Sequence, residues 1–264
     1  MSDAPTVGAI ISAAVKTAHS NQPACWPRAP SQSPTANPYA DAALTLDEHN
    51  AGARANRISL HLAEKKLAEA QQDCTILLAE PEARAVDFAL CARVSHALQD
   101  RVEERARLDR LLTLTPTHVS ALLARAWLNE QENRLADGLA DYAKVLELEP
   151  ESGLAWNNRA WIRIELGEYA AARADADRAV DLEPDSAAAR GTRCFALAGL
   201  GELEAARSDC VRALELRPTL VDRGMLAFID ERYADARRDW ETASEADPAQ
   251  ARQLRPWLAK LPAR

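Results

Sequence analysis

The chain has 264 residues, of which 47% are hydrophobic and 27% are charged, proportions typical of a protein that folds around a hydrophobic core. Alanine, leucine, glutamate and arginine dominate and only nine residues are glycine, which favours helices over strands. The formal net charge is −8 and the arginines alternate with acidic residues, which argues against nucleic acid as the main partner, because phosphate binding needs a basic surface.

Residues 1–48 precede any regular pattern and are predicted to be an N-terminal extension. Their only sustained apolar run is 7–15, VGAIISAAV, which is too short to span a bilayer and follows no basic residue. The stretch 21–39 is rich in proline, serine and asparagine and is typical of a linker. We therefore expect a cytoplasmic protein without a membrane span, or an exported one if the true start lies upstream.

A repeat of 34 residues follows the extension. Its clearest markers are prolines at that interval and leucines two residues before them: Pro116, Pro150, Pro184 and Pro218, with Leu114, Leu148, Leu182 and Leu216. A period of this length, sustained without slippage, indicates stacked supersecondary units. In the block 153–186 we predict helices from about residue 154 to 166 and from about 170 to 182. Gly167 suits the turn between them because a helix end favours a left-handed residue.

The stretch 155–184, AWNNRAWIRIELGEYAAARADADRAVDLEP, resembles a tetratricopeptide repeat (TPR). The residues that match the signature places of this family are Trp156, Leu166, Gly167, Tyr169, Ala172, Ala179 and Pro184. The resemblance is clear over 85–118, 119–152, 153–186 and 187–220, and weaker over 51–84 and over 221–248, which is shortened by about four residues.

This resemblance implies an all-α fold, a right-handed superhelical solenoid of stacked antiparallel helix pairs with a concave inner surface. The array is expected to fill residues 49–248 with about five to six repeats. Residues 249–264 are expected to form a capping helix and tail, because the terminal units of a solenoid must meet water on one face.

In five blocks an arginine on the first helix is followed sixteen residues later by an aspartate on the second. These pairs are Arg57 and Asp73, Arg125 and Asp141, Arg159 and Asp175, Arg193 and Asp209, and Arg223 and Asp239. The block 85–118 breaks both halves of the rule, with Cys91 and Arg107 at the two places. Because the two residues depart together, the pattern favours ion pairs that brace each helix pair over an anion-binding ladder.

The resemblance places one residue of each first helix on the concave face: Arg93, Trp127, Trp161 and Phe195. An exposed aromatic row usually marks a contact surface. The predicted partner-binding groove consists of Trp127, Trp161, Phe195, Leu123, Asn157, Asn158, Ile164, Glu130 and Glu165. Three interpretations stay open: the row is core, it holds a peptide or helix of another protein, or it holds the N-terminal segment of this chain.

Five cysteines, Cys25, Cys74, Cys91, Cys194 and Cys210, are widely spaced without a CxxC pair. We interpret them as small buried thiols rather than as disulfides or metal ligands. The five histidines are scattered over different repeats, and no P-loop, dinucleotide turn, HExxH or GxSxG motif is present. No metal, cofactor or catalytic residue is expected.

The predicted function is that of a non-enzymatic protein–protein interaction scaffold or adaptor, which binds a peptide or helix of a partner protein in the concave groove. The alternative is a structural subunit of a larger assembly, with its groove filled by its own N-terminal segment. Some TPR proteins clamp the acidic C-terminus of chaperones with basic residues. Only Asn158 matches that clamp, while Leu123, Ala188 and Thr192 stand at its basic places, so this partner is not expected.

Overall fold

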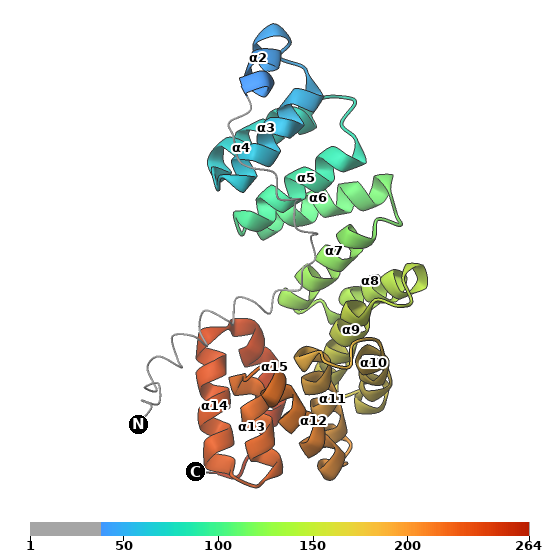
Figure 1. Ribbon diagram of the computed structural model, residues 1–264, viewed down its shortest axis with the longest axis vertical. Coiled ribbons are helices and arrows are strands. Elements are labelled where there is room, and N and C mark those ends of the chain that lie inside the picture. The colour runs from blue at the N-terminus through green and yellow to red at the C-terminus, as the bar shows by residue number, and fades with distance from the viewer. Residues whose placement is uncertain (1–37, 264) are drawn as a thin grey trace. The chain divides into compact units, whose positions relative to one another are not determined.

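The computed structural model describes residues 38–263, which form fourteen helices and no strand (Figure 1). These residues divide into two compact units, which we call the N-terminal unit (38–132) and the C-terminal unit (133–263). Residues 1–37 and 264 lie outside the described part of the chain, and with them most of the predicted extension.

The N-terminal unit contains a short leading helix, two helix pairs and the first helix of a third pair. Its helices are α2 (Pro38–Leu46), α3 (Ala51–Ala63), α4 (Leu67–Ala79), α5 (Ala85–Ala97), α6 (Arg101–Leu114) and α7 (Val119–Gln131). The C-terminal unit comprises α8 (Leu135–Leu148), α9 (Gly153–Glu165), α10 (Tyr169–Leu182), α11 (Ala187–Gly199), α12 (Leu203–Leu216), α13 (Leu220–Ile229), α14 (Tyr233–Ala246) and α15 (Pro248–Leu258). The predicted all-α fold of stacked helix pairs is confirmed, and α9 and α10 begin within one residue of their expected starts.

The two helices of each pair are joined by a turn that contains one left-handed residue. Gly167 and Gly201 take this conformation with φ of 75° and 79°. Lys65, Gln99, Asn133 and Glu231 adopt it with φ near 60°. The left-handed conformation costs a residue with a side chain about 1–2 kcal/mol. These four turns nevertheless keep the geometry that Gly167 and Gly201 give to the other two.

Small residues of the second helices allow the helices to approach closely. Ala172, Ala206 and Ala236 share one place in the repeat, and each is fully buried. A larger side chain at this place would separate the helices, since protein interiors are close-packed. One hydrophobic core therefore extends from the end of α9 to the end of the described chain, where it includes Trp240 and Trp257.

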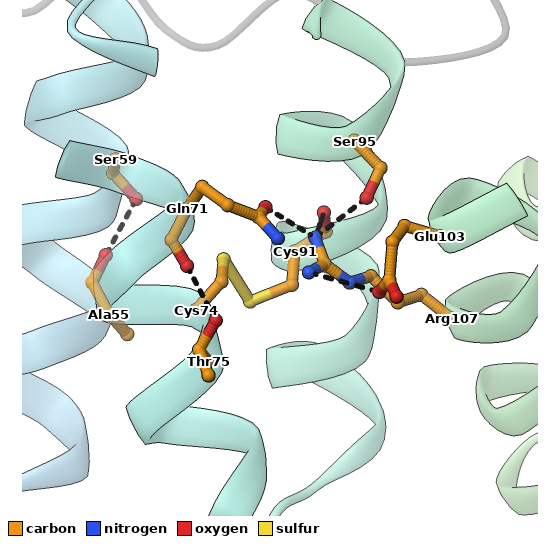
Figure 2. Close-up of a disulfide and its surroundings, with 9 residues drawn as sticks. All are labelled: Ala55, Ser59, Gln71, Cys74, Thr75, Cys91, Ser95, Glu103 and Arg107. Atoms are coloured by element: carbon orange, nitrogen blue, oxygen red, sulfur yellow. Dashed lines mark hydrogen bonds and ion pairs between the residues drawn. A yellow bond between two sulfur atoms is a disulfide. The ribbon is translucent and has the colours of Figure 1, made fainter. Parts of the chain in front are cut away.

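Two disulfides join helices of the array, which corrects our interpretation of these cysteines as free thiols. Cys74 on α4 bonds to Cys91 on α5 with an S–S distance of 2.30 Å (Figure 2). Cys194 on α11 bonds to Cys210 on α12 at 2.09 Å. Cys194 and Cys210 are sixteen residues apart, the same separation as in the arginine–aspartate pairs. Their disulfide therefore links the two facing helices of one block. The cysteines have no CxxC spacing, but this sixteen-residue separation was already present in the sequence as a signal of the bond.

Asp222 is a buried carboxyl group where α13 packs against α11. The Thr219 hydroxyl donates to Asp222 Oδ2 over 2.6 Å and accepts from the Asp222 backbone N–H over 3.0 Å, which caps α13. A Cβ atom on Gly191 of α11 would lie 2.5 Å from Asp222 Oδ1, so glycine is required there. Burial raises the pKa of Asp222 to about 6, against the opposing effects of the Thr219 hydrogen bond and the Arg217 charge.

We predict that the four paired cysteines resist alkylation when the protein from its native host is denatured without reductant. Each bridge closes a loop of 16 or 17 residues, which contributes about 3 kcal/mol to stability. Mass spectrometry of the alkylated chain, with and without reductant, measures the number of protected thiols. Alkylation of all four residues before reduction would contradict the pairing.

We predict that Asp222→Asn stabilises the protein at neutral pH. Since the folded-state pKa of Asp222 lies above its ordinary value of 3.8, the stability contributed by the protonated carboxyl is present in acid and is lost as pH rises from about 4 to about 6. A rise in pKa from 3.8 to about 6 corresponds to about 3 kcal/mol of folding free energy. Urea unfolding at pH 4 and pH 7.5 measures the effect. Equal stability of variant and wild type at pH 7.5 would contradict it.

Candidate functional site

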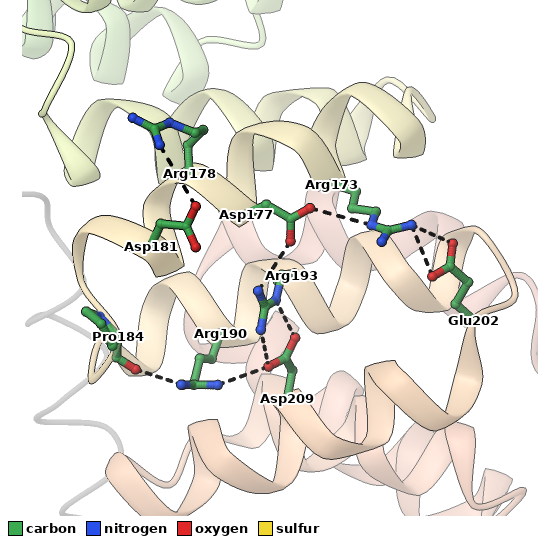
Figure 3. A network of polar contacts seen from close by, with 9 residues as sticks. All are labelled: Arg173, Asp177, Arg178, Asp181, Pro184, Arg190, Arg193, Glu202 and Asp209. Atoms are coloured by element: carbon green, nitrogen blue, oxygen red, sulfur yellow. Dashed lines mark hydrogen bonds and ion pairs between the residues drawn. The ribbon is translucent and has the colours of Figure 1, made fainter.

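Arginine–aspartate contacts connect the two helices within four of the described pairs. Arg159 Nε and Nη2 donate to the two carboxylate oxygens of Asp175 over 2.7 and 2.8 Å, and Arg163 Nη1 donates to Asp175 over 2.7 Å. Arg193 is bound to Asp209 in the same bidentate way, over 2.6 and 2.9 Å (Figure 3). The carboxylates are almost completely buried, so the arginines compensate charges that would otherwise be costly.

The arginine at this place in the repeat also binds the preceding helix, a contact that was not among the predictions from the sequence. Arg193 Nη1 donates to Asp177 over 3.2 Å, and Arg125 Nη1 donates to Asp109 over 2.9 Å. Arg125 lies in the N-terminal unit and Asp141 in the C-terminal unit, so their pairing stays a prediction. The remaining arginine–aspartate contacts of this type are Arg57 with Asp73 and Asp41, and Arg223 with Asp239.

The block 85–118 replaces this ion pair with a different brace. Arg107 stands at the aspartate place and donates from Nη1 to the carbonyl oxygen of Cys91 and to Ser95 Oγ, both over 2.7 Å (Figure 2). Its Nη2 lies 3.4 Å from Glu103. Cys91 at the arginine place forms the disulfide to Cys74 of α4. The backbone contact of Arg107 therefore joins α5 to α6, while the covalent bond joins α5 to the preceding pair.

In the C-terminal unit the predicted aromatic row is covered by the last helix of the chain. Trp161 meets Phe195 edge to face, with ring centroids 5.1 Å apart. Trp257 of α15 packs against the other side of Phe195 at 5.5 Å and against Phe228 at 5.9 Å. Phe195 and Trp257 are each only 1% exposed. The inner face of this unit is therefore occupied by α15.

A charge contact holds α15 in the same position. Arg252 Nε donates to Glu165 of α9 over 3.0 Å, and the Glu165 side chain is 5% exposed. Leu254 and Leu261 are buried beside Trp257, and the Lys260 ammonium lies 3.9 Å from the centroid of the Trp257 ring. One buried ion pair and a row of apolar side chains thus fix a helix on the inner face.

The other groove residues of the C-terminal unit form part of its interior. Ile164 is 4% exposed. Asn157 and Asn158 are half-buried; Asn157 Nδ2 donates to Asn158 Oδ1 over 3.2 Å, and Asn158 Nδ2 donates to the Tyr142 hydroxyl over 3.2 Å. Asn157 Oδ1 is buried without a hydrogen-bond partner in the described part of the chain.

The N-terminal unit holds the remaining predicted groove residues and one that the prediction left out. Trp127 on α7 is half-buried and meets His96 of α5 edge to face, with centroids 5.4 Å apart. Leu123 and Glu130 on α7 are 9% and 7% exposed. Arg93 on α5 stands at the same repeat place as Trp127 and is half-buried. Burial lowers the pKa of Arg93.

Within residues 38–263 no group of three or more histidine, cysteine, aspartate or glutamate side chains could hold a metal ion. None of the described helices has the length and hydropathy required to cross a bilayer.

We predict that Trp257→Ala destabilises the protein by about 3–5 kcal/mol, because it removes a fully buried aromatic side chain. Arg255→Ala, at an exposed position of the same helix, is the matched control and is expected to change stability by less than about 0.5 kcal/mol. Urea unfolding followed by circular dichroism measures both. A loss for Trp257→Ala no larger than that of the control would show that α15 is not anchored.

Comparison with known proteins identifies the repeat. Residues 153–186 match the tetratricopeptide repeat family model. No curated protein matches the chain in sequence. A tetratricopeptide repeat protein from Parabacteroides merdae aligns with a TM-score of 0.64 and 17% identity over 79% of this chain and 87% of that one.

Two further solved structures share the fold. The C-terminal part of a TPR repeat-containing protein from Cytophaga hutchinsonii gives a TM-score of 0.60 at 10% identity, over 83% of this chain and 92% of that one. A chain of the APC/C hetero-tetramer Cut9–Hcn1 gives 0.57 at 13% identity, over 73% of this chain and 38% of that one. Residues 153–186 are therefore a tetratricopeptide repeat, and the described chain shares the fold of stacked helix pairs with these tetratricopeptide repeat structures.

Proposed function

We propose that this protein is a protein–protein interaction scaffold that holds a segment of a partner protein on the inner face of its N-terminal unit. The fold is that of proteins that are generally non-enzymatic scaffolds and typically bind protein partners such as peptides. Stacked repeats offer an extended surface for such contacts. We define the inner face of the N-terminal unit by Ser59 on α3, Arg93 on α5 and Trp127 on α7, which share one place in the repeat.

The observation that carries this proposal is the position of α15 on the C-terminal unit. There the inner face accepts an amphipathic helix, with Trp257 against Phe195 and Phe228. Within the N-terminal unit the one ring contact of Trp127 in the described part of the chain is that with His96 of α5, and no aromatic side chain of a further helix covers it. Trp127 remains partly exposed on that face, and tryptophan is enriched among the residues that dominate interface energy.

The proposed function involves no catalysis and no cofactor. The partner is a protein, and neither nucleic acid nor a chaperone C-terminus is required. One member of the fold, the APC/C chain in the Cut9–Hcn1 hetero-tetramer, is assembled with a protein partner, which supports the same class of role here.

The cytoplasmic location expected from the sequence stays a prediction. The two buried disulfides favour an oxidising compartment instead, because such bonds are rare where glutathione keeps thiols reduced. We infer that the protein acts in such a compartment, and the alkylation experiment on protein from the native host tests this.

We predict that Trp127→Ala weakens partner binding by at least about thirtyfold, the effect of losing a hot-spot side chain worth 2 kcal/mol or more. Affinity purification of the full-length chain from its native cells, with quantitative mass spectrometry, compares wild type and variant. Val102→Ala, at a position of α6 that is 80% exposed, serves as the matched control. Circular dichroism checks that both variants fold. Recovery of the same partners in the same amounts by both variants would contradict the proposed surface.

The alternative, a structural subunit whose groove is filled by its own N-terminal segment, concerns residues outside the described part of the chain. It is favoured by the precedent of α15, a segment of this chain that occupies the inner face of the C-terminal unit. Deletion of residues 1–37 separates the two. A partner that binds only after the deletion, with a red shift of tryptophan emission, supports self-filling over an open binding surface.

A further inference from the structure

Arg93 is a half-buried arginine without an anionic partner. Its side chain makes no hydrogen bond, ion pair or aromatic contact with any residue in the described part of the chain. Burial is the one cause of its lowered pKa, and no carboxylate opposes the effect. A desolvated charge without compensation costs free energy, so the position is unfavourable for the isolated protein.

A scarcity of acidic residues does not explain why Arg93 lacks an anionic partner in the described part of the chain. The chain has 40 aspartate and glutamate residues against 32 lysine and arginine residues. Arginines elsewhere on the first helices, such as Arg159 and Arg193, are paired with carboxylates over less than 3 Å. Arg93 stands two residues after Cys91, which occupies the brace place, and therefore on a different side of α5.

Arg93 lies on the proposed partner-binding surface, between the equivalent residues of the neighbouring first helices. Ser59 holds its place on α3 and Trp127 holds it on α7. His96 is one turn further along α5 than Arg93, and it contacts the Trp127 ring at 5.4 Å. A segment that crosses the face from α3 to α7 therefore passes Arg93 before it reaches Trp127.

The C-terminal unit shows how such a face accepts a charged segment. There Glu165, on the first helix α9, is 5% exposed and binds Arg252 of the incoming helix α15 over 3.0 Å. Five residues later on α15, Trp257 packs on Phe195. One buried charge and one adjacent aromatic site thus recognise a helix of the opposite charge. The N-terminal unit also offers one half-buried charge and one aromatic side chain, with the sign of the charge reversed: Arg93 on α5 and Trp127 on the next first helix, α7.

We propose that Arg93 binds the carboxylate of an aspartate or glutamate side chain in the partner segment that docks on the inner face of the N-terminal unit. This inference rests on the proposed function. The guanidinium offers a planar pair of N–H donors that matches both oxygens of a carboxylate. Because Arg93 lies in the middle of the face, the carboxylate comes from a side chain within the segment rather than from its end.

The geometry also predicts the spacing in the partner. Packed helices lie about 8–10 Å apart, so the acidic residue and the apolar residue that meets Trp127 are separated by about three residues in an extended segment. In a helical segment, which rises about 1.5 Å per residue, the separation is about six residues.

A first measurement distinguishes a binding role from a structural one. Arg93→Gln removes a desolvated charge that has no partner, so we expect the melting temperature of the full-length chain to stay equal or to rise. A fall as large as that of a core substitution would show that Arg93 supports the fold, and would overturn the proposal.

The second measurement uses a random peptide library displayed on phage and selected against the immobilised full-length chain. The strongest binder is synthesised with an amidated C-terminus and titrated into the wild type, Arg93→Gln and Arg110→Gln. Arg110 is an exposed arginine of α6 and provides the matched control. We expect the selected peptides to share an acidic residue at one position.

Arg93→Gln is expected to weaken binding of this peptide about tenfold, which corresponds to about 1.4 kcal/mol, while Arg110→Gln leaves it unchanged. Arg93→Glu is expected to regain affinity for a peptide whose acidic residue is changed to lysine. Absence of selected binders, absence of a shared acidic residue, or wild-type affinity of Arg93→Gln would each overturn the proposal.

Trp127→Ala separates this inference from the proposed function. If Trp127→Ala abolishes peptide binding and Arg93→Gln does not change it, the proposed binding surface is supported and the proposed role of Arg93 is wrong. If neither substitution changes the affinity, the proposed surface itself is wrong.

Discussion

The helix pairs of this protein depend on a contact that crosses from the first helix to the second at one place in the repeat. In the block 153–186 it is the bidentate pair of Arg159 and Asp175, whose carboxylate is buried. A buried carboxylate is tolerated only while its partner is present, so the pair strongly favours one register between the helices.

The same crossing is made by different chemistry elsewhere. Arg107 binds the backbone carbonyl of Cys91, and Cys91 forms a disulfide to the preceding pair. Cys194 and Cys210 add a covalent link within their own block. An ion pair and a disulfide serve the same geometric purpose, but a disulfide also limits the unfolded chain. A contact that fixes the helices is thus present at this place in several repeats, although different residues form it.

The two inner faces differ in what covers them. In the C-terminal unit Phe195 is sealed by Trp257, so the aromatic row continues the core there. In the N-terminal unit Trp127 and Arg93 remain half-buried. One repeat architecture therefore presents both a filled surface and a surface with an uncompensated charge, and their side chains rather than their folds determine this difference.

Much of the fold could be predicted because a period of 34 residues repeats the same local rules several times. The pairing of Arg159 with Asp175 could be predicted from their spacing in the same way, and Arg159 Nε lies 2.7 Å from Asp175 Oδ2. The docking of α15 could not be predicted, since Trp257 and Phe195 are 62 residues apart and belong to no common repeat place. The disulfides were not predicted because the cysteines lack CxxC spacing. The importance of Arg93 could not be predicted because it lies in the absence of a carboxylate partner in the described part of the chain.

The contacts between successive pairs have a consequence for the effect of salt. Asp41, Asp109 and Asp177 connect α2 to α3, α6 to α7 and α10 to α11, and the Cys74–Cys91 bond connects α4 to α5. The place of these aspartates is held by Ala143 before α9 and by Val211 before α13. Neither side chain can form an ion pair. The α8–α9 junction is joined instead by the hydrogen bond from Asn158 to the Tyr142 hydroxyl, and the α12–α13 junction by the ion pair of Arg207 and Asp230. Salt should therefore weaken the α10–α11 and α12–α13 junctions, which ion pairs join, more than the α8–α9 junction, which a neutral hydrogen bond joins.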